Sequence, residues 1–193
     1  LKLVGQVGFT QKLELEYALP TINKKRTLGL TTNFLFTRNK EIGYTTTGNK
    51  LQFHRAEDDI LLRRFRGGMG VLYRPDIQHF HHFFLNYHQN RIHESVRTDL
   101  NPDFFLDGLG QRYFSLGYEY SFDRRDIRPY PLSGRFFKIA IQKDGFGIYD
   151  NINAFAVSAM FKQYFKLHEK WSLEFSLRGK TDLLRKRQPY YNS

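Results

Sequence analysis

Few residues of this sequence have the types and spacing that chemistry would need. Ser115 and Ser121 precede Asp123, but no histidine is apposed to them, so a Ser–His–Asp nucleophile has no support. The chain contains no Cys, which excludes a thiolate metal site, a cysteine nucleophile and a disulfide framework. No glycine-rich phosphate loop or nucleophile elbow is present. What remains is a run of charges, Asp123, Arg125 and Asp126, and a group of histidines at positions 79, 81, 82, 88 and 93.

The histidines resemble a metal site in sequence, because imidazole is a common metal ligand. The segment that carries them, His79–Ile92, alternates as a strand does, with its side chains pointing to opposite faces in turn. His79 and His81 therefore share one face, while His82 and His88 share the other. We expect interfacial or interior histidines here and no metal site, no catalytic residue and no cofactor.

The run of charges directly follows the most regular strand pattern of the chain. Phe114, Leu116, Tyr118, Tyr120 and Phe122 lie on one face of the predicted strand, and small or charged residues lie on the other. A strand with two such faces separates two different solvents, one of which we expect to be lipid.

About nine segments of the chain show this alternation, and no amphipathic helix is predicted. Most of them are about 9 to 14 residues long, which exceeds the length of common globular strands and matches what a tilted strand needs to cross a bilayer. The sequence predicts an all-β fold, a transmembrane antiparallel up-and-down β-barrel represented by part of its wall. The predicted strands cover residues 1–9, 12–19, 28–36, 60–73, 79–92, 113–123, 137–142, 154–165 and 171–180.

The connections between these strands alternate in length. Short turns that carry Pro or charges, such as Pro20–Arg26 and Arg124–Gly134, alternate with generally longer polar loops, of which Arg38–Asp59 and Arg91–Gln111 are the longest. Outer-membrane barrels have this asymmetry, with short turns in the periplasm and long loops outside. The Asp123 end of its strand should thus face the periplasm. Aromatic residues near strand ends, expected at the membrane interfaces, are Tyr17, Tyr73, Tyr87 and Trp171.

Composition agrees with this reading. A net charge of +11 and 17% aromatic residues invite a nucleic-acid hypothesis, but Lys and Arg are scattered through the predicted turns and polar strand faces, so we expect no nucleic-acid partner. The mean hydropathy is −0.56, and no apolar run approaches the roughly 20 residues of a spanning helix. The start at Leu1 and the stretch Arg185–Ser193 without a terminator indicate a fragment.

The spacing D-x-R-D-x-x-x-x-P-x-x-G, flanked by alternating strands, resembles the barrel of the BamA/TamA superfamily, also called the bacterial surface antigen family. Arg124 and the extra Pro129 are variations on the pattern. Leu15–Pro20 with the later Leu28–Leu30 looks like an earlier strand–turn–strand of that barrel, while Leu177–Lys180 and Gln188–Tyr191 look like the approach to its sixth extracellular loop. The residues that carry the spacing are Asp123, Arg125, Asp126, Pro131 and Gly134.

The resemblance implies that residues 1–193 belong to a single barrel domain and correspond to roughly the third through eleventh strands of sixteen. It places the periplasmic POTRA domains, the seam strands and the Arg-Gly motif of the sixth loop outside this chain. It implies a non-enzymatic factor of the bacterial outer membrane that inserts other barrels or passes polypeptide. The implied partners are unfolded outer-membrane protein clients, accessory periplasmic or outer-membrane lipoproteins, and lipids including lipopolysaccharide.

Two groups of residues are therefore candidates for function. The motif turn is expected to be a structural turn, in which its acids and arginine neutralise one another and the turn amides, or else a partner contact. The charges on the polar strand faces are expected to line the barrel interior. These interior charges are Glu119, Glu174, Arg64, Arg66, Lys138 and Arg178.

Three alternatives stay open. The barrel could be attached to a patatin-like lipase domain, in which case a Gly-x-Ser-x-Gly motif would lie upstream of this chain. It could be a passive porin or ligand-binding barrel, which would conduct without affecting client insertion. A soluble β-sandwich is a further possibility for the fold.

Overall fold

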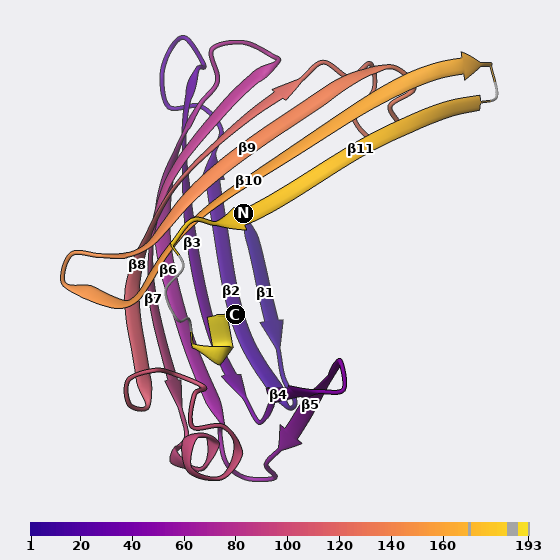
Figure 1. Ribbon diagram of the computed structural model, residues 1–193. Helices are drawn as coiled ribbons and strands as arrows, with labels where there is room; N and C mark the ends of the chain where they lie inside the picture. Colours follow the sequence, from indigo (N-terminus) through magenta and orange to yellow (C-terminus); the bar gives the residue numbers. More distant parts are fainter. Residues whose placement is uncertain (170, 185–188, 193) are drawn as a thin grey trace.

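The computed structural model describes residues 1–169, 171–184 and 189–192 of the chain. Its main element is one antiparallel sheet in the order β1-β2-β3-β6-β7-β8-β9-β10-β11, which curves strongly and does not close on itself (Figure 1). The predicted all-β class and the nine-stranded wall are confirmed. The strands are β1 (Lys2–Gln6), β2 (Thr10–Leu19), β3 (Leu28–Asn39), β6 (Leu62–Tyr73), β7 (His79–Ile92), β8 (Gly110–Asp123), β9 (Gly134–Phe146), β10 (Tyr149–His168) and β11 (Trp171–Asp182).

The register gives the sheet two chemically different faces. Leu85 of β7 lies between Met69 of β6 and Leu116 of β8, so apolar residues line up across the strands on one face, which we call the outer face. The C-terminal end of the chain lies in the hollow on the other side, which is the concave face (Figure 1). Large apolar side chains exposed on the outer face include Leu13, Leu15, Met69, Val71, Phe83, Leu85, Leu116, Ile141, Leu173, Phe175 and Leu177.

The long connection after β3 contains a hairpin that the alternation of the sequence did not predict. Strands β4 (Glu41–Thr47) and β5 (Lys50–Arg55) form a separate two-stranded sheet within the stretch expected to be a loop, Arg38–Asp59. The connection between β9 and β10 is also shorter than expected, because both strands continue through most of residues 144–150. Gly48 and Asn49, with φ of +57° and +60°, form the turn of the hairpin.

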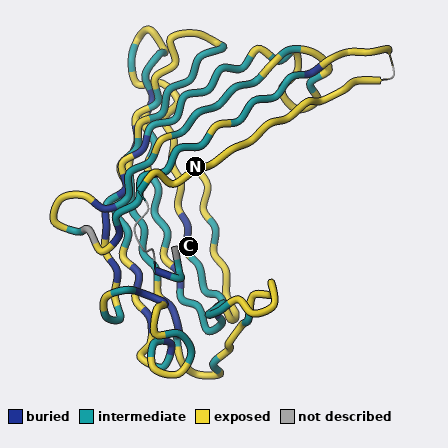
Figure 2. Tube along the Cα trace, viewed as in Figure 1, coloured by how far each residue is buried: buried dark blue, intermediate teal, exposed yellow. Residues whose placement is uncertain are grey.

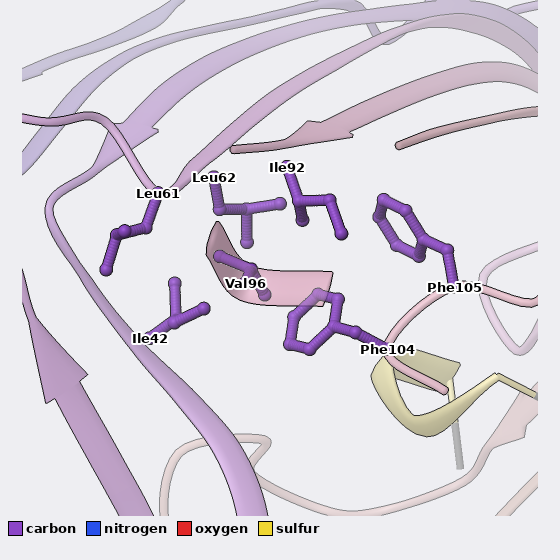
Figure 3. Packing of buried hydrophobic residues seen from close by; sticks show 7 residues of the cluster. All are labelled: Ile42, Leu61, Leu62, Ile92, Val96, Phe104 and Phe105. Atoms are coloured by element: carbon purple, nitrogen blue, oxygen red, sulfur yellow. The ribbon is translucent and has the colours of Figure 1, made fainter. Parts of the chain in front are cut away.

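The long connections fold together at one end of the sheet. Their buried cluster contains Ile42 from β4, Leu62 and Ile92 from the wall, and side chains of the loop between β7 and β8, which includes the short π-helical turn η1 (Val96–Leu100) (Figure 3). The 3-10 turn η2 (Tyr190–Asn192) packs onto this cluster, and the Tyr190 N–H donates to the Asp103 carbonyl over 3.0 Å. The cluster residues are Ile42, Leu61, Leu62, Ile92, Val96, Phe104 and Phe105.

Burial follows this arrangement. Figure 2 shows buried positions gathered toward the end with the long connections, whereas β11 is exposed along its whole length. Gln188 of the segment Gln188–Tyr191, together with residues 185–187 and 193, lies outside the described residues. Within the described part of the chain, no helix has the length and apolar character needed to span a membrane.

Candidate functional site: the Asp123–Gly134 turn and the charged concave face

Asp123, at the end of β8, is held by two arginines of the turn that follows. Arg125 donates from Nε to Oδ1 and from Nη2 to Oδ2, each over 2.8 Å, which is the bidentate geometry of a strong charge-assisted pair. Arg128 approaches the same carboxylate at 3.2 Å. The Asp123 side chain is only 7% exposed, so the pair is shielded from water and ties the turn to the strand end.

Asp126 organises the interior of the turn through backbone amides. Its Oδ1 accepts hydrogen bonds from the N–H of Ile127 at 2.8 Å and Leu132 at 3.0 Å, and its Oδ2 accepts one from Ser133 at 3.2 Å. The Ile127 amide, followed by those of Ser133 and Leu132, lowers the pKa of Asp126 below its ordinary value of 3.8. The carboxylate therefore bridges both sides of a ten-residue connection without a salt bridge.

Gly134 ends the turn in a backbone conformation that favours glycine. Its φ is +102°, and a Cβ at this position would lie 2.1 Å from the Arg124 carbonyl oxygen. That close approach brings the Arg124 N–H within 2.9 Å of the Arg135 carbonyl, which starts the pairing of β8 with β9. Pro131 lies inside the same connection, where its ring fixes its own φ.

The turn also contacts the neighbouring strands. Arg128 lies 5.2 Å from the Phe80 ring and donates to the Ile77 carbonyl over 3.2 Å, in the turn between β6 and β7. On the other side, the Gln163 amide of β10 donates to the Gly134 carbonyl over 3.0 Å. The five motif residues thus belong to one connected unit that spans β7 to β10.

All six charges predicted for the interior lie on the concave face. Glu119 and Lys138 form an ion pair of 3.0 Å between β8 and β9, and Arg178 of β11 lines the same hollow of about 360 Å³. Glu174 pairs instead with Lys162 of β10 at 2.7 Å, a partner that was not among the predicted residues. The strand registers determine the face of the sheet on which each of these residues lies.

The two arginines of β6 lie apart from this cluster. Arg64 donates to the Thr37 hydroxyl over 2.9 Å, and Arg66 lies opposite His88 in the register. Among the described residues, these contacts do not join the six charges into one network. Near β1, Glu14 binds Lys2 at 2.5 Å and also pairs with Lys12, which makes a second, separate charge cluster on the concave face.

The histidines divide between the two faces as alternation predicts. His79 and His81, on the outer face, hydrogen-bond the hydroxyls of Tyr120 at 2.7 Å and Tyr118 at 2.9 Å. On the concave face, the His88 ring stacks on Tyr113 at 4.5 Å. No group of three His, Asp or Glu side chains in the described ranges is arranged to hold a metal ion.

The Omp85 superfamily domain matches residues 1–190, almost the whole chain. The chain belongs to the Omp85 superfamily. Among solved structures, this Omp85 chain is similar to the crystal structure of BamA from Haemophilus ducreyi lacking POTRA domains 1–3, with a TM-score of 0.68 at 14% sequence identity. The similarity covers 95% of this chain and 35% of the BamA chain, so this sequence spans about a third of the length of that structure. No curated protein matches it.

These matches confirm the family predicted from the D-x-R-D-x-x-x-x-P-x-x-G spacing and the barrel-type fold of this Omp85 chain. At this identity the BamA similarity establishes the fold alone. The Omp85 superfamily is a family of a non-enzymatic kind.

Proposed function

We propose that this Omp85 chain is part of the barrel wall of a bacterial outer-membrane factor that inserts other barrels or translocates polypeptide. The observation that carries the proposal is a nine-stranded antiparallel wall, apolar outside and charged within, inside an Omp85 domain. Residues 1–193 then form one piece of a single barrel domain. The partners in this proposal are unfolded client barrels, accessory lipoproteins and outer-membrane lipids including lipopolysaccharide.

The wall contributes a boundary between lipid and water and needs no covalent chemistry or cofactor. The outer face places apolar side chains such as Leu85 and Leu116 where acyl chains would pack. The ion pairs Glu119–Lys138 and Glu174–Lys162 fit the water-filled interior, where a charge keeps its hydration. In such a factor, a client strand pairs with an exposed backbone edge at the barrel seam, which the family resemblance places outside this chain.

Reconstitution of the full-length protein tests the proposal. The protein would be placed in phospholipid vesicles, and a urea-unfolded client barrel added with and without it. We expect faster appearance of the folded, heat-modifiable client with the protein present. Unchanged client folding in vesicles that contain correctly folded protein would overturn the assembly role.

The same vesicles separate the alternatives. Steady ionic conductance without any effect on client folding would identify a passive porin. Release of free fatty acid from the phospholipid would identify an attached lipase domain. Translocation of a labelled polypeptide into the vesicles, without insertion of barrels, would assign the secretion-type role within the superfamily.

For the Asp123–Gly134 turn we propose a structural role. The carboxylates of Asp123 and Asp126 are already occupied by Arg125 and by backbone amides, which leaves little of either for a partner. The variants Arg125→Ala and Asp126→Ala should lower barrel stability and client assembly together. If the barrel stays folded and heat-modifiable while client assembly fails, the turn is a partner contact instead.

A further inference from the structure

Three arginines lie side by side on the outer face of the sheet. Arg38 of β3 is the register partner of Arg63 of β6, and Arg63 is the register partner of Arg91 of β7. Directly opposite residues of an antiparallel pair point to the same side, so the three guanidinium groups emerge together. The row crosses two inter-strand spacings, roughly 10 Å.

Nothing in the described part of the chain neutralises this row. Among the described residues, none of the three arginines has an acidic partner within 4.0 Å or a hydrogen bond from its side chain. Arg63 and Arg91 are exposed and line a hollow of about 370 Å³ together with His93 and Glu94, and Glu94 is the single acid of that lining. Like charges directly opposite one another destabilise a sheet. A bound anion would remove this penalty.

Two further cations extend the basic side of the outer face. Arg112 of β8 is opposite Gln89, two residues before Arg91, and it lies over the Tyr149 ring at 5.1 Å. Lys143 of β9 is opposite Leu116, but its Nζ is already held by the Asn153 amide oxygen at 2.9 Å and by backbone carbonyls. The free positive charge therefore concentrates on β3, β6 and β7.

A row of aromatic rings lies immediately inward from the arginines on the same face. Ring centroids are 5.3 Å apart for Phe34–Phe65, 6.1 Å for Phe65–Tyr87 and 5.4 Å for Tyr87–Phe114. Cations above an aromatic and aliphatic belt match an amphiphile with an anionic headgroup and acyl chains. A soluble anion would use the arginines but not the rings.

The position of the row along the strands selects the leaflet. Arg38 is near the end of β3, Arg63 near the start of β6 and Arg91 near the end of β7, which are the strand ends joined by the long connections. Figure 1 shows these connections together at one end of the sheet. In outer-membrane barrels that end faces the cell exterior. At the opposite end of the outer face, Arg135 of β9 lies over the Phe122 ring at 5.5 Å and does not form part of a comparable row.

We propose that Arg38, Arg63 and Arg91 form a binding site for the phosphate groups of lipopolysaccharide. The acyl chains then pack on the row of rings formed by Phe34, Phe65, Tyr87 and Phe114. Guanidinium groups bind phosphate oxygens in a bidentate manner, and a headgroup with more than one phosphate spans a row of this width. The site rests on the proposed outer-membrane location, because that location places the long-loop end in the leaflet that contains lipopolysaccharide.

The test measures lipid binding to the full-length protein in detergent, without any client. Native mass spectrometry would compare the wild type with the triple variant Arg38→Gln, Arg63→Gln and Arg91→Gln at increasing concentrations of purified lipopolysaccharide. We expect the triple variant to bind at least about tenfold more weakly, because several charge-assisted hydrogen bonds are lost. Equal binding by both proteins would overturn the site.

A matched control removes the same charge from the other end. The triple variant Lys24→Gln, Lys25→Gln and Arg135→Gln loses three cations near the short turns, and its binding should stay at the wild-type value. The wild type should bind dephosphorylated lipid A at least about tenfold more weakly than it binds lipopolysaccharide, which tests the phosphate contacts even if the arginine variant does not fold. If phosphatidylglycerol competes as well as lipopolysaccharide, the assignment to lipopolysaccharide is wrong.

Client insertion is scored separately, in vesicles without lipopolysaccharide. There the arginine variant should insert clients at the wild-type rate. A protein that binds lipopolysaccharide through the row but never inserts clients would overturn the assembly role and leave the lipid site intact. A protein that inserts clients but binds lipopolysaccharide equally well with and without the three arginines would overturn the lipid site alone.

Discussion

At the scale of single residues, position 134 requires a backbone conformation that residues other than glycine rarely adopt. Because its φ is +102° and a Cβ would meet the Arg124 carbonyl, we expect Gly134→Ala to lower the free energy of unfolding by about 1–3 kcal/mol. Urea unfolding of the full-length protein in lipid vesicles measures this change. Gly179→Ala on β11 is the control, since its Cβ would meet nothing within 4 Å. Equal losses in the two variants would contradict the assignment of strain to Gly134.

The low pKa of Asp126 gives the turn a dependence on pH. A carboxylate whose folded-state pKa is lowered contributes stability in full above its unfolded value of about 3.8, and this contribution disappears as the pH falls through the folded-state pKa. We expect Asp126→Asn to be less stable than the wild type at pH 7 and to approach it below pH 3.8. Urea midpoints of both proteins across this range provide the measurement. A difference that is constant with pH would contradict the amide-bound carboxylate.

The sequence predicted that the charged residues of the turn neutralise one another and the turn amides, but it did not predict which group binds which. The pattern Asp123, Arg125, Asp126 indicates charges that compensate one another. It does not reveal that Arg125 pairs with Asp123, while the Asp126 carboxylate accepts hydrogen bonds from backbone amides. The arginine row was equally hidden, because the positions of Arg38 and Arg63 relative to each other depend on a strand register that a single sequence does not contain.

At the scale of elements, the cluster at the long-loop end should hold those connections against the wall. Phe105 is 1% exposed within it, so Phe105→Ala should lower the free energy that holds the connections folded by about 3–5 kcal/mol. The expected result is faster protease cleavage between residues 93 and 109 while the barrel remains heat-modifiable. Phe53→Ala on β5 is the matched control, because Phe53 is 62% exposed and should tolerate truncation. Equal cleavage of the two variants would contradict a docked loop.

The β4–β5 hairpin was missed for a physical reason. Wall strands are recognised in the sequence by apolar and polar side chains that alternate between two solvents. This hairpin lies outside the wall and has no lipid face, so it lacks that pattern. A signal was nevertheless present, since Gly48–Asn49 is a two-residue sequence suited to a turn with positive φ at both positions. The buried Phe104 and Phe105 gave no such signal, because they stand in a polar stretch without periodicity.

At the scale of the whole molecule, the two faces should respond differently to a new charge. Leu177, near the middle of β11, lies on the outer face, and the neighbouring Ser176 lies on the concave face. Leu177→Arg should destabilise the full-length protein in a bilayer by about 2–4 kcal/mol, while Ser176→Arg should have little effect. Unfolding in vesicles measures both. Similar losses for the two variants would contradict a lipid-facing outer surface.

The order of strands in the wall has a consequence for how the chain folds. Each strand of the large sheet pairs with the next wall strand in the sequence, from β1 to β11. Contacts between near neighbours in the chain cost little closure entropy, and the two longest connections add only a logarithmic increment. The wall can therefore grow by zippering, one hairpin at a time. Its slowest step should be the joining of β3 to β6, because the separate β4–β5 hairpin stands between them.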